Sequence, residues 1–482
     1  MEIDNLIKNI KKITGNSSDV VIREINIKKN KINIIFIESL SSSNDITESI
    51  LKRLTNLDDI YEDIYTHIYN MLPASNISKI NTIEEVIKNI YNGFTVLIID
   101  SNKYIAIESK ATLDRGINSV ENEFSMAGPK DGFTENVIKN IGLVRKRLRT
   151  PNLYIDTTTI GKEGNNKIAI CYMSNIASND LITEVKERLN DINIDAILDS
   201  GYINEKVIIK SNIFPVTNIT ERPDTAAQGL LEGKVILLLD NSPYAIIVPT
   251  FFTDFLHTPD DYYQKSTNIT FVRLLRTIAF FISIFLPAYY ISITTNNFSS
   301  IPLTLLINFT AQRQLVPFPA FFEAIAMIIC FEILRESDIR IPSKTGTSVS
   351  ILGGLILGSA AVEAGIISPI MIIVIAISAI GALVFTSPAL INAIRYYRLL
   401  ILMICIFFGI YGLFIGLTLL ITNLSSITSF GYPYTSPISP IIKEEISDSI
   451  IKTTPKQTNN RNPLLAEKNI IRGKCIWKNY LY

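Results

Sequence analysis

The chain has 482 residues, and its 45 Lys and Arg balance 45 Asp and Glu for a formal net charge of +0. This length exceeds one ordinary domain, and the balanced charge gives no sign of a nucleic-acid partner. The average hides a division, because charged residues crowd the region before Arg276 and become scarce after it. The polar stretch Met1–Lys31 lacks a signal-peptide pattern, so we expect the front half to stay in the cytosol.

The first 150 residues predict two hairpins and several helices. Alternation of apolar and polar residues predicts paired strands, and helical spacing predicts helices between and after them. The paired strands are Val20–Ile27 with Lys31–Glu38 and Phe94–Asp100 with Tyr104–Glu108, and the helices are Asp45–Leu54, Asp59–Met71 and Thr134–Leu148.

The same kind of pattern restarts beyond Pro151. It predicts a helix at Asn179–Asn190 and strands at Leu153–Asp156, Lys167–Tyr172, Val235–Leu239 and Tyr244–Val248. We therefore expect two α/β subdomains, residues 1–150 and 151–268.

The following region predicts membrane-spanning helices, each of which needs about 20 mostly apolar residues. Ile301–Phe309 is too short to cross and could be re-entrant or interfacial. The expected fold is an α/β soluble N-terminal region of two subdomains, a polytopic α-helical membrane domain of about five spans over 269–424, and a C-terminal segment and polar tail over 425–482. The five predicted spans are Thr277–Ile293, Pro317–Leu334, Thr347–Gly365, Ser368–Ser387 and Leu399 to about Leu424.

Basic residues collect on one side of these spans, and the positive-inside rule makes that side the cytoplasm. We therefore expect the soluble half to be cytoplasmic. Five crossings would place the basic tail from Lys443 to Arg472 outside, against the rule, so either Ser425–Ile442 re-enters the membrane or one predicted span is wrong. The basic clusters are Arg273 and Arg276, then Arg335, Arg340 and Lys344, then Arg395 and Arg398.

The sequence does not match motifs for catalysis, metal binding or nucleotide binding. Gly161-Lys162 lacks the upstream glycine of a phosphate-binding loop, and Lys344-Thr345-Gly346 fits no better. His67 and His257 are the only histidines, and the four cysteines show no CxxC spacing. We predict no catalytic site, no metal site and no cofactor.

Three long strings carry a family resemblance. They are Glu123-Phe-Ser-Met-Ala-Gly-Pro-Lys-Asp-Gly-Phe-Thr-Glu135; Thr220-Glu-Arg-Pro-Asp224 with Leu230-Leu-Glu-Gly-Lys234; and Pro317-Phe-Pro-Ala320 with Phe331-Glu-Ile-Leu-Arg-Glu336 and Ala360-Ala-Val-Glu-Ala-Gly365. Together they closely resemble the A subunit of the GerA-family spore germinant receptors, over about Glu108 to Pro440.

The resemblance implies a receptor component rather than an enzyme, in the inner membrane of the dormant spore. It implies as partners a permease-like B subunit, which binds the nutrient, and a C-subunit lipoprotein. It also implies a homo-oligomeric ring that forms a nutrient-gated ion channel. The alternative is a non-conducting scaffold that couples the B subunit to downstream machinery. A secondary transporter is a third possibility, but the sequence shows no paired broken-helix repeat.

Thr347–Gly365 is the candidate pore helix. Its small residues at helical spacing favour either close helix packing or a pore lining, and a ring allows both. Glu363 should lie near the outer mouth, where it could concentrate cations or be a solvated turn residue. The pore-lining or packing candidates are Ser350, Gly353, Gly354, Leu357, Gly358, Ala361 and Glu363.

Two acidic residues within the second span need partners. Glu323 could pair with an Arg of a neighbouring subunit, line a wet cavity or contact the permease-like subunit. Glu332 lies on a different face and should pair with Arg335 at the cytoplasmic end.

Charged strings also mark the soluble half. Glu221, Arg222 and Asp224 could form a turn-fixing ion network or a subunit contact. Arg145, Arg147 and Arg149 could bind anions or the membrane surface, although a solvated helix face is the commoner explanation.

Overall fold

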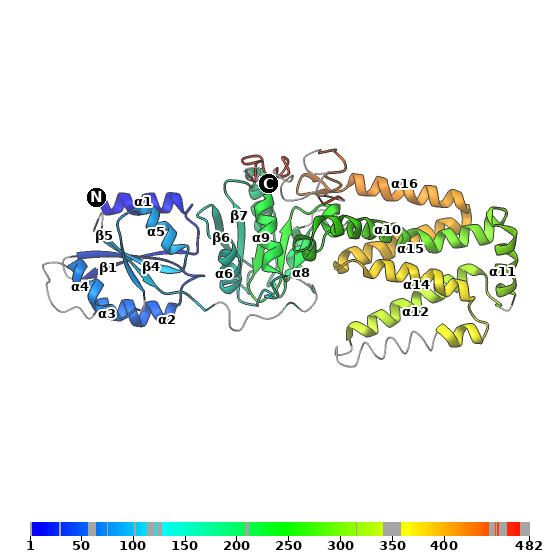
Figure 1. The fold of residues 1–482 in the computed structure, drawn as a ribbon, viewed down its shortest axis with the longest axis horizontal. Helices are drawn as coiled ribbons and strands as arrows, with labels where there is room; N and C mark the ends of the chain where they lie inside the picture. Colours follow the sequence, from blue (N-terminus) through cyan, green and yellow to red (C-terminus); the bar gives the residue numbers. More distant parts are fainter. Residues whose placement is uncertain are drawn as a thin grey trace, which may run out of the picture.

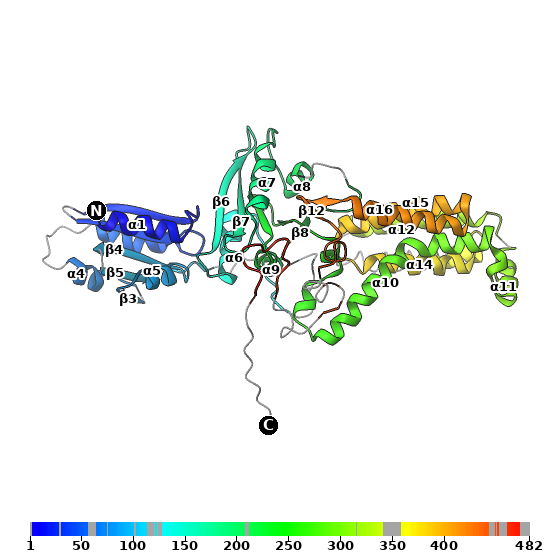
Figure 2. The ribbon, with the colours of Figure 1, turned by 90° about the horizontal axis from the view of Figure 1, so that it is seen from above.

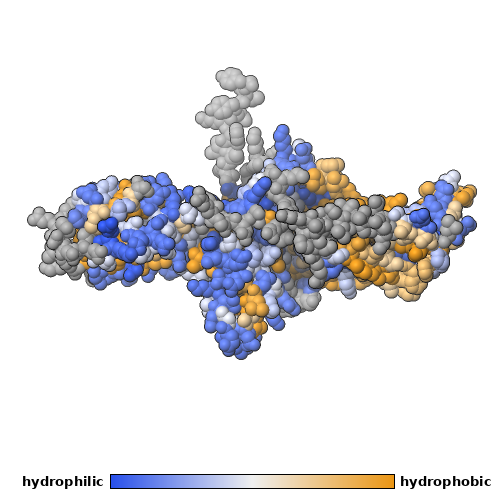
Figure 3. Space-filling view, turned by 90° about the horizontal axis from the view of Figure 1, so that it is seen from below, coloured by the Kyte–Doolittle hydropathy of each residue, from blue (hydrophilic) through white to orange (hydrophobic). Residues whose placement is uncertain are grey.

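The computed structural model places three parts in a row along the long axis of the molecule: two α/β subdomains and a helical half (Figure 1). On the face seen in Figure 3, hydrophilic residues predominate on the subdomains and hydrophobic residues on much of the helical half. The structure describes residues 2–27, 30–55, 64–74, 76–100, 103–112, 120, 123, 128–207, 212–314, 316–340, 358–442, 449, 451–452 and 460–472.

The first subdomain is an antiparallel sheet with helices on both faces. In the described residues the strand order is β1-β2-β4-β5-β3, and the two predicted hairpins, β1–β2 and β4–β5, are confirmed. The elements are α1 (Glu2–Ile13), β1 (Val20–Ile27), β2 (Asn30–Ile37), α2 (Ser43–Asp45), η1 (Ile46–Leu51), α3 (Lys52–Thr55), α4 (Ile64–Met71), β3 (Ile77–Ile80), α5 (Ile83–Ile90), β4 (Phe94–Asp100) and β5 (Lys103–Glu108).

Apolar residues on both faces of β2 explain why helices cover this sheet twice. Successive side chains of a strand point to opposite faces. Ile32 and Ile34 pack with the helices between β2 and β3, whereas Ile35 and Ile37 pack with α1 and α5. The sheet therefore separates two small cores.

The second subdomain contains a further antiparallel sheet, with the strand order β6-β7-β9-β10-β8 in the described residues. Its α6 and α9 cover one face and its α7 and α8 the other. The elements are α6 (Val137–Arg147), β6 (Leu153–Ile160), β7 (Asn166–Met173), α7 (Asn179–Asn190), α8 (Ser200–Val207), β8 (Asn218–Thr220), α9 (Pro223–Glu232), β9 (Val235–Leu239) and β10 (Ala245–Val248).

The two subdomains are copies of one topology. Each has a helix, a hairpin, helices, a single strand, a helix and a second hairpin, in that order along the chain. In each, the single third strand lies at the sheet edge beside the last strand, so both sheets read 1-2-4-5-3. The soluble half is therefore an internal structural repeat.

A buried ion pair fastens the two copies together. The guanidinium of Arg145 in α6 binds both carboxyl oxygens of Asp19, with Nε–Oδ2 and Nη2–Oδ1 distances of 2.8 Å. Both side chains are almost fully buried. The expected solvated helix face is therefore wrong for Arg145. Close approach is also needed at Gly15, which has φ +65 and lies against the ring of Tyr154.

The helical half is a bundle whose helices run back and forth along the long axis (Figures 1 and 2). The helices η2 (Phe252–Leu256) and η3 (Pro259–Tyr262) lead into it. Its elements are α10 (Ser266–Ile291), η4 (Ser292–Asn296), η5 (Phe298–Ser300), α11 (Leu303–Arg313), α12 (Ala320–Arg340), α14 (Pro369–Leu383), α15 (Pro388–Phe408) and α16 (Ile410–Ser426), and residues 358–363 are also helical.

The fifth predicted span is wrong, because Leu399–Leu424 contains two helices. Gly409 has φ +57 between α15 and α16, a conformation that a residue with a Cβ rarely adopts. The chain reverses there, and α16 returns along α15 (Figure 1). Gly412 and Gly416 let the two helices pack closely, since a Cβ at either would lie 2.8 Å from an atom of α15.

The helices of this half differ in how well their length and hydropathy suit a membrane span. In the described residues, Ser266–Asn296 and Pro388–Phe408 are long and apolar enough to span a bilayer, and Pro369–Leu383 and Ile410–Ser426 are shorter apolar helices. Charged residues interrupt α12, which lies over the second predicted span.

The chain beyond α16 returns to the second subdomain. The ribbon β11 (Thr428–Ser429) and β12 (Tyr432–Pro433) places Phe430 in the core on the α7 face. Further on, Arg461 donates from Nε to the carbonyl oxygen of Leu231 at 2.7 Å, and Ala466 joins the core on the α9 face. The tail and the soluble half therefore lie on the same side of the helical bundle.

Candidate functional site

In the described part of the candidate pore helix, Gly358 faces open space, and Ser359, Ala360 and Ala364 are exposed. Among the described residues, a Cβ added at Gly358 would meet nothing within 4 Å, whereas Ala361 packs partly against the helical core. Glu363 is exposed. Ser350, Gly353, Gly354 and Leu357 lie outside the described residues.

Glu323 in α12 has partners within its own chain. Its Oε2 accepts hydrogen bonds from the backbone N–H of Ser368 at 2.9 Å and from the Ser368 hydroxyl at 2.7 Å. Its Oε1 lies 3.8 Å from Nε of Arg313 in α11. The side chain is fully buried, and Oε1 has no hydrogen-bond partner among the described residues.

The predicted pair of Glu332 with Arg335 is wrong. Arg398 donates from Nη2 to Oε1 of Glu332 at 2.8 Å, and Nε of Arg395 lies 2.8 Å from Oε2. Both arginines belong to α15, which lies beside Glu332 only in the folded bundle. Helical spacing reveals only the neighbours of Glu332 on its own helix, and Arg398 lies 66 residues away in the chain.

A second charge cluster joins the soluble half to α10, and sequence reasoning missed it. Asp261, fully buried in η3, accepts from Nε of Arg273 at 2.9 Å and from Nη1 of Arg276 at 2.9 Å. Burial raises the pKa of Asp261, but the hydrogen bond from Arg273 and the charges of both arginines outweigh it and hold the pKa below its usual value.

The tail enters this cluster through the carbonyl oxygen of Ser449. Nη1 of Arg273 donates to it at 3.2 Å, and Nε2 of His257 lies 2.6 Å away. Burial, followed by the positive charge of Arg273, lowers the pKa of His257 to about 3. A neutral His257 therefore lies where the soluble half, α10 and the tail meet.

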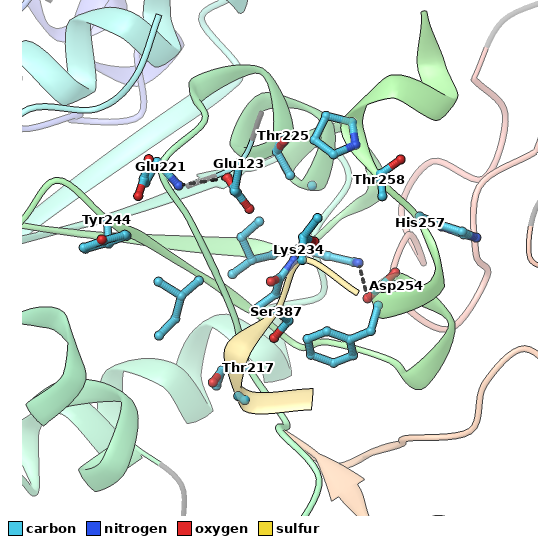
Figure 4. Close-up of a pocket in the computed structure, with 18 of the residues that line it drawn as sticks. Glu123, Thr217, Glu221, Thr225, Lys234, Tyr244, Asp254, His257, Thr258 and Ser387 are labelled. Carbon is cyan, nitrogen blue, oxygen red and sulfur yellow. Dashed lines mark hydrogen bonds and ion pairs between the residues drawn. The ribbon is translucent and has the colours of Figure 1, made fainter. Parts of the chain in front are cut away.

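A cavity of about 430 Å³ lies beside this joint (Figure 4). The second subdomain lines most of it, the turn between α14 and α15 adds Thr386 and Ser387, and the start of α15 adds Pro388 and Ala389. The Lys234 side chain points toward Asp254, and their Nζ–Oδ2 distance is 2.7 Å (Figure 4). Because both halves contribute walls, a change in their relative position must change the shape of this cavity.

Glu123 lies at the cavity wall next to the Thr220–Asp224 string (Figure 4). Its Oε2 accepts from the hydroxyl of Thr220 at 2.6 Å and from the backbone N–H of Glu221 at 3.1 Å. Burial raises the pKa of Glu123 to about 7, against the lowering effect of these hydrogen bonds. Its charge therefore changes close to neutral pH.

The string itself forms a network within the chain. The buried guanidinium of Arg222 donates to both carboxyl oxygens of Asp224 and to the carbonyl oxygens of Glu123 and Pro129. Asp224 also accepts from the hydroxyl of Tyr263 at 2.5 Å. Arg222 and Asp224 thus form an ion pair within the chain, Glu221 joins the network through its backbone N–H, and a subunit contact of these residues stays a prediction. Among the described residues, no cluster of His, Cys, Asp and Glu suits a metal ion.

Comparisons with known proteins agree on a family. A family model described as Bacillus/Clostridium GerA spore germination protein matches residues 8–464. Spore germination protein KA of Bacillus subtilis (strain 168) is 35% identical, over 98% of this chain and 88% of that protein. Spore germination protein GerQA of Bacillus cereus is 33% identical, over 93% of this chain and 95% of that protein.

A solved structure also aligns with the front of the chain. It is the crystal structure of the N-terminal domain of the A subunit of the Bacillus megaterium spore germinant receptor GerK3, which is 30% identical. The alignment covers 51% of this chain and 94% of that chain, with a TM-score of 0.39. The family match over most of the chain, together with relatives that cover nearly all of it, is decisive: this chain belongs to the GerA family of spore germination proteins.

Proposed function

We propose that the chain is the A-type subunit of a nutrient germinant receptor and that several copies form a ring that conducts ions. Family membership supports the receptor role. The observation that carries the channel role is the open face at Gly358, in a stretch of small residues that ends the candidate pore helix. A small face that meets none of the described residues suits close packing against another copy around an axis.

The proposed topology has six crossings. We infer an even number of crossings between Ser266 and Thr428, because the tail packs on the soluble half. The break at Gly409 supplies the missing crossing, with α10, α12, the candidate pore helix, α14, α15 and α16 as the spans. This arrangement puts the tail's basic residues on the cytoplasmic side, as the positive-inside rule requires.

Residue accessibility tests this topology. Single cysteines are placed at exposed Lys139 and Glu467 in a variant without native cysteines. In sealed right-side-out vesicles, we expect both cysteines to be equally protected from an impermeant thiol reagent. A cysteine at exposed Phe298, on the outer end, should be labelled. Labelling of the Glu467 position while the Lys139 position stays protected would overturn the six-crossing topology.

The joint at Asp261 supports a route for the signal. Asp261, Arg273 and Arg276 tie the second subdomain to the first turns of α10, and the tail closes the same cluster. A movement of the soluble half is thereby transmitted to the first span. The proposed partners are the permease-like B subunit, which binds the nutrient, and the lipoprotein C subunit.

Ion flux in liposomes tests the channel. Gly358→Phe fills a space that is open within one chain, so the protein should fold while a ring loses flux. Ala360→Phe is the matched control, because it lies about 200° around the same helix and is already exposed. Leu357 and Gly354 are further positions for bulky or polar substitutions.

The outcomes separate channel from scaffold. Flux through the wild-type oligomer, lost in Gly358→Phe and kept in Ala360→Phe, supports the pore. Folded oligomers without flux in any variant, with and without the B and C subunits, would leave the non-conducting scaffold as the function.

A further inference from the structure

Glu323 is a buried acidic residue whose two carboxyl oxygens differ in their hydrogen bonds. Oε2 receives two hydrogen bonds from Ser368, whereas Oε1 has no hydrogen-bond partner among the described residues and only the 3.8 Å approach of Arg313. Burying an acidic group is costly unless it is paired and hydrogen-bonded. The position therefore needs a reason beyond packing, because an apolar residue would fill the same space at lower cost.

Ser368 shows what the carboxyl group holds. It is the N-cap of α14, where a serine oxygen ordinarily accepts from a backbone N–H of the first turn. Here the cap makes no such bond, and the Ser368 hydroxyl donates to Glu323 instead. A negative group at this place is also favoured by the positive end of the α14 dipole. Glu323 thus fixes the start of α14 to the side of α12.

The segment just before Ser368 connects α14 to the helical residues 358–363. It closes with hydrogen bonds from Gly365 to Val362 and from Ile366 to Ala361, and Gly365 has φ +63. These bonds shape the turn but do not attach it to the bundle. Ile367 packs into the core of the bundle, and Glu323 adds the polar attachment of the turn through Ser368.

Arg313 extends the attachment to α11. This helix has no buried residue of its own, and Phe309 meets the ring of Tyr290 in α10 at 6.1 Å. Four elements, α10, α11, α12 and the turn before α14, therefore meet around one carboxyl group at the end of the bundle far from the soluble half (Figure 1).

We propose that Glu323 is a latch that holds the outer turn 364–368, so that breaking its contacts with Ser368 releases the end of the small-residue helix and favours ion conduction. This inference rests on the proposed channel function. Glu323 is a positioning residue that acts through Ser368, and it does not itself need to contact the conducted ion.

The test is basal ion flux through reconstituted full-length oligomers. Glu323→Gln keeps an oxygen acceptor for Ser368 and removes the charge, whereas Ser368→Ala removes only the hydroxyl bond. Each should raise basal flux, and Glu323→Leu should raise it at least about tenfold, the factor for losing a hydrogen bond to a charged group. Ser378→Ala is the matched control, because its buried hydroxyl also makes a 2.7 Å bond in α14, to the Ser283 carbonyl oxygen. Its flux should stay unchanged.

The latch is supported if basal flux rises in Glu323→Gln and Ser368→Ala, rises most in Glu323→Leu and stays at the wild-type value in Ser378→Ala. If Glu323→Gln and Ser368→Ala both keep the wild-type flux, the latch is overturned but the channel is not. An equal rise of flux in Ser378→Ala would have the same meaning. If Glu323→Leu fails to assemble, the two conservative variants decide. Absence of flux in the wild type overturns the proposed function itself.

Discussion

The two soluble subdomains share one topology but differ in how they start the helix after the third strand. In the first copy, Thr82 and Glu85 cap α5 through a local capping box. In the second copy, Arg222 precedes Pro223 without a side-chain cap and reaches instead to Asp224, Glu123 and Pro129. The first helix start is self-sufficient, whereas the second depends on distant segments.

The same difference holds at the outer surfaces. The second copy receives the tail on both faces of its sheet and carries the joint to α10. The first copy touches the rest of the chain mainly through Asp19 and its neighbours. One scaffold thus serves as a terminal module in one place and as a connector in the other, and the connector is where charged side chains become buried.

The largest expected effect comes from cutting the link between the copies. Arg145→Leu leaves Asp19 buried without its partner, and we expect a loss of about 3–5 kcal/mol in local opening free energy. Hydrogen exchange of the full-length protein measures it in α6 and the Ser17–Val20 segment. Exposed Lys139→Ala in the same helix is the control, and equal losses in both variants would contradict the role of the buried pair.

The next effect sharpens the difference in attachments. Arg461→Ala removes hydrogen bonds to the carbonyl oxygens of Leu231, Asn469 and Ile471. We expect the tail to lose about 1.5–3 kcal/mol of protection against exchange, because these bonds involve a charged group. Glu467→Ala, in an exposed neighbour, should have little effect. Loss of protection throughout the first copy would argue against a connector limited to the second.

Glu123 gives the connector a pH dependence. Its pKa is raised to about 7, so it stabilises the fold fully below its unfolded value of 4.5, and this contribution disappears as pH rises through 7. Glu123→Gln should therefore reduce the fall in stability between pH 5 and pH 8, by on the order of 1–2 kcal/mol after allowing for partial exposure. Denaturant unfolding measures the free energy of unfolding of the wild type and of Glu123→Gln at each pH. If the two free energies change in parallel with pH, Glu123 is not the source of the pH dependence.

The smallest effect belongs to the self-sufficient helix start. Thr82→Ala removes one cap on the surface, and we expect α5 alone to lose about 1 kcal/mol. Hydrogen exchange should show the change in α5 and leave α9 as it was. A loss that spreads into the second copy would mean that the first is not independent.

Local patterns were sufficient for the regular elements of the soluble half. The strands β1, β4 and β9 and the helix α7 begin and end where alternation or helical spacing placed them. Short elements such as β3, β8 and α8 were missed, because three to eight residues carry little periodicity. Arg145 was misjudged for a related reason, since an exposed arginine and a buried one look alike until Asp19 is brought beside it.

In the helical half the sequence located the apolar segments, but a single apolar run hid the reversal at Gly409. Hydropathy averages over a window and does not register one glycine with positive φ. The tail's basic residues did signal the error, since they violated the charge rule under five crossings.

The sequence by itself determined the family, the α/β character of the front half and the division between charged and apolar regions, because these depend on composition, period and ordered strings. Tertiary structure decided the duplication of the fold, the side on which the tail lies, and the partners of Asp19, Asp261, Glu323 and Glu332. The partners of these four carboxyl groups share one physical reason. A buried carboxyl group is stabilised by whichever hydrogen-bond donor folding brings within about 3 Å, and that donor is rarely its neighbour in sequence.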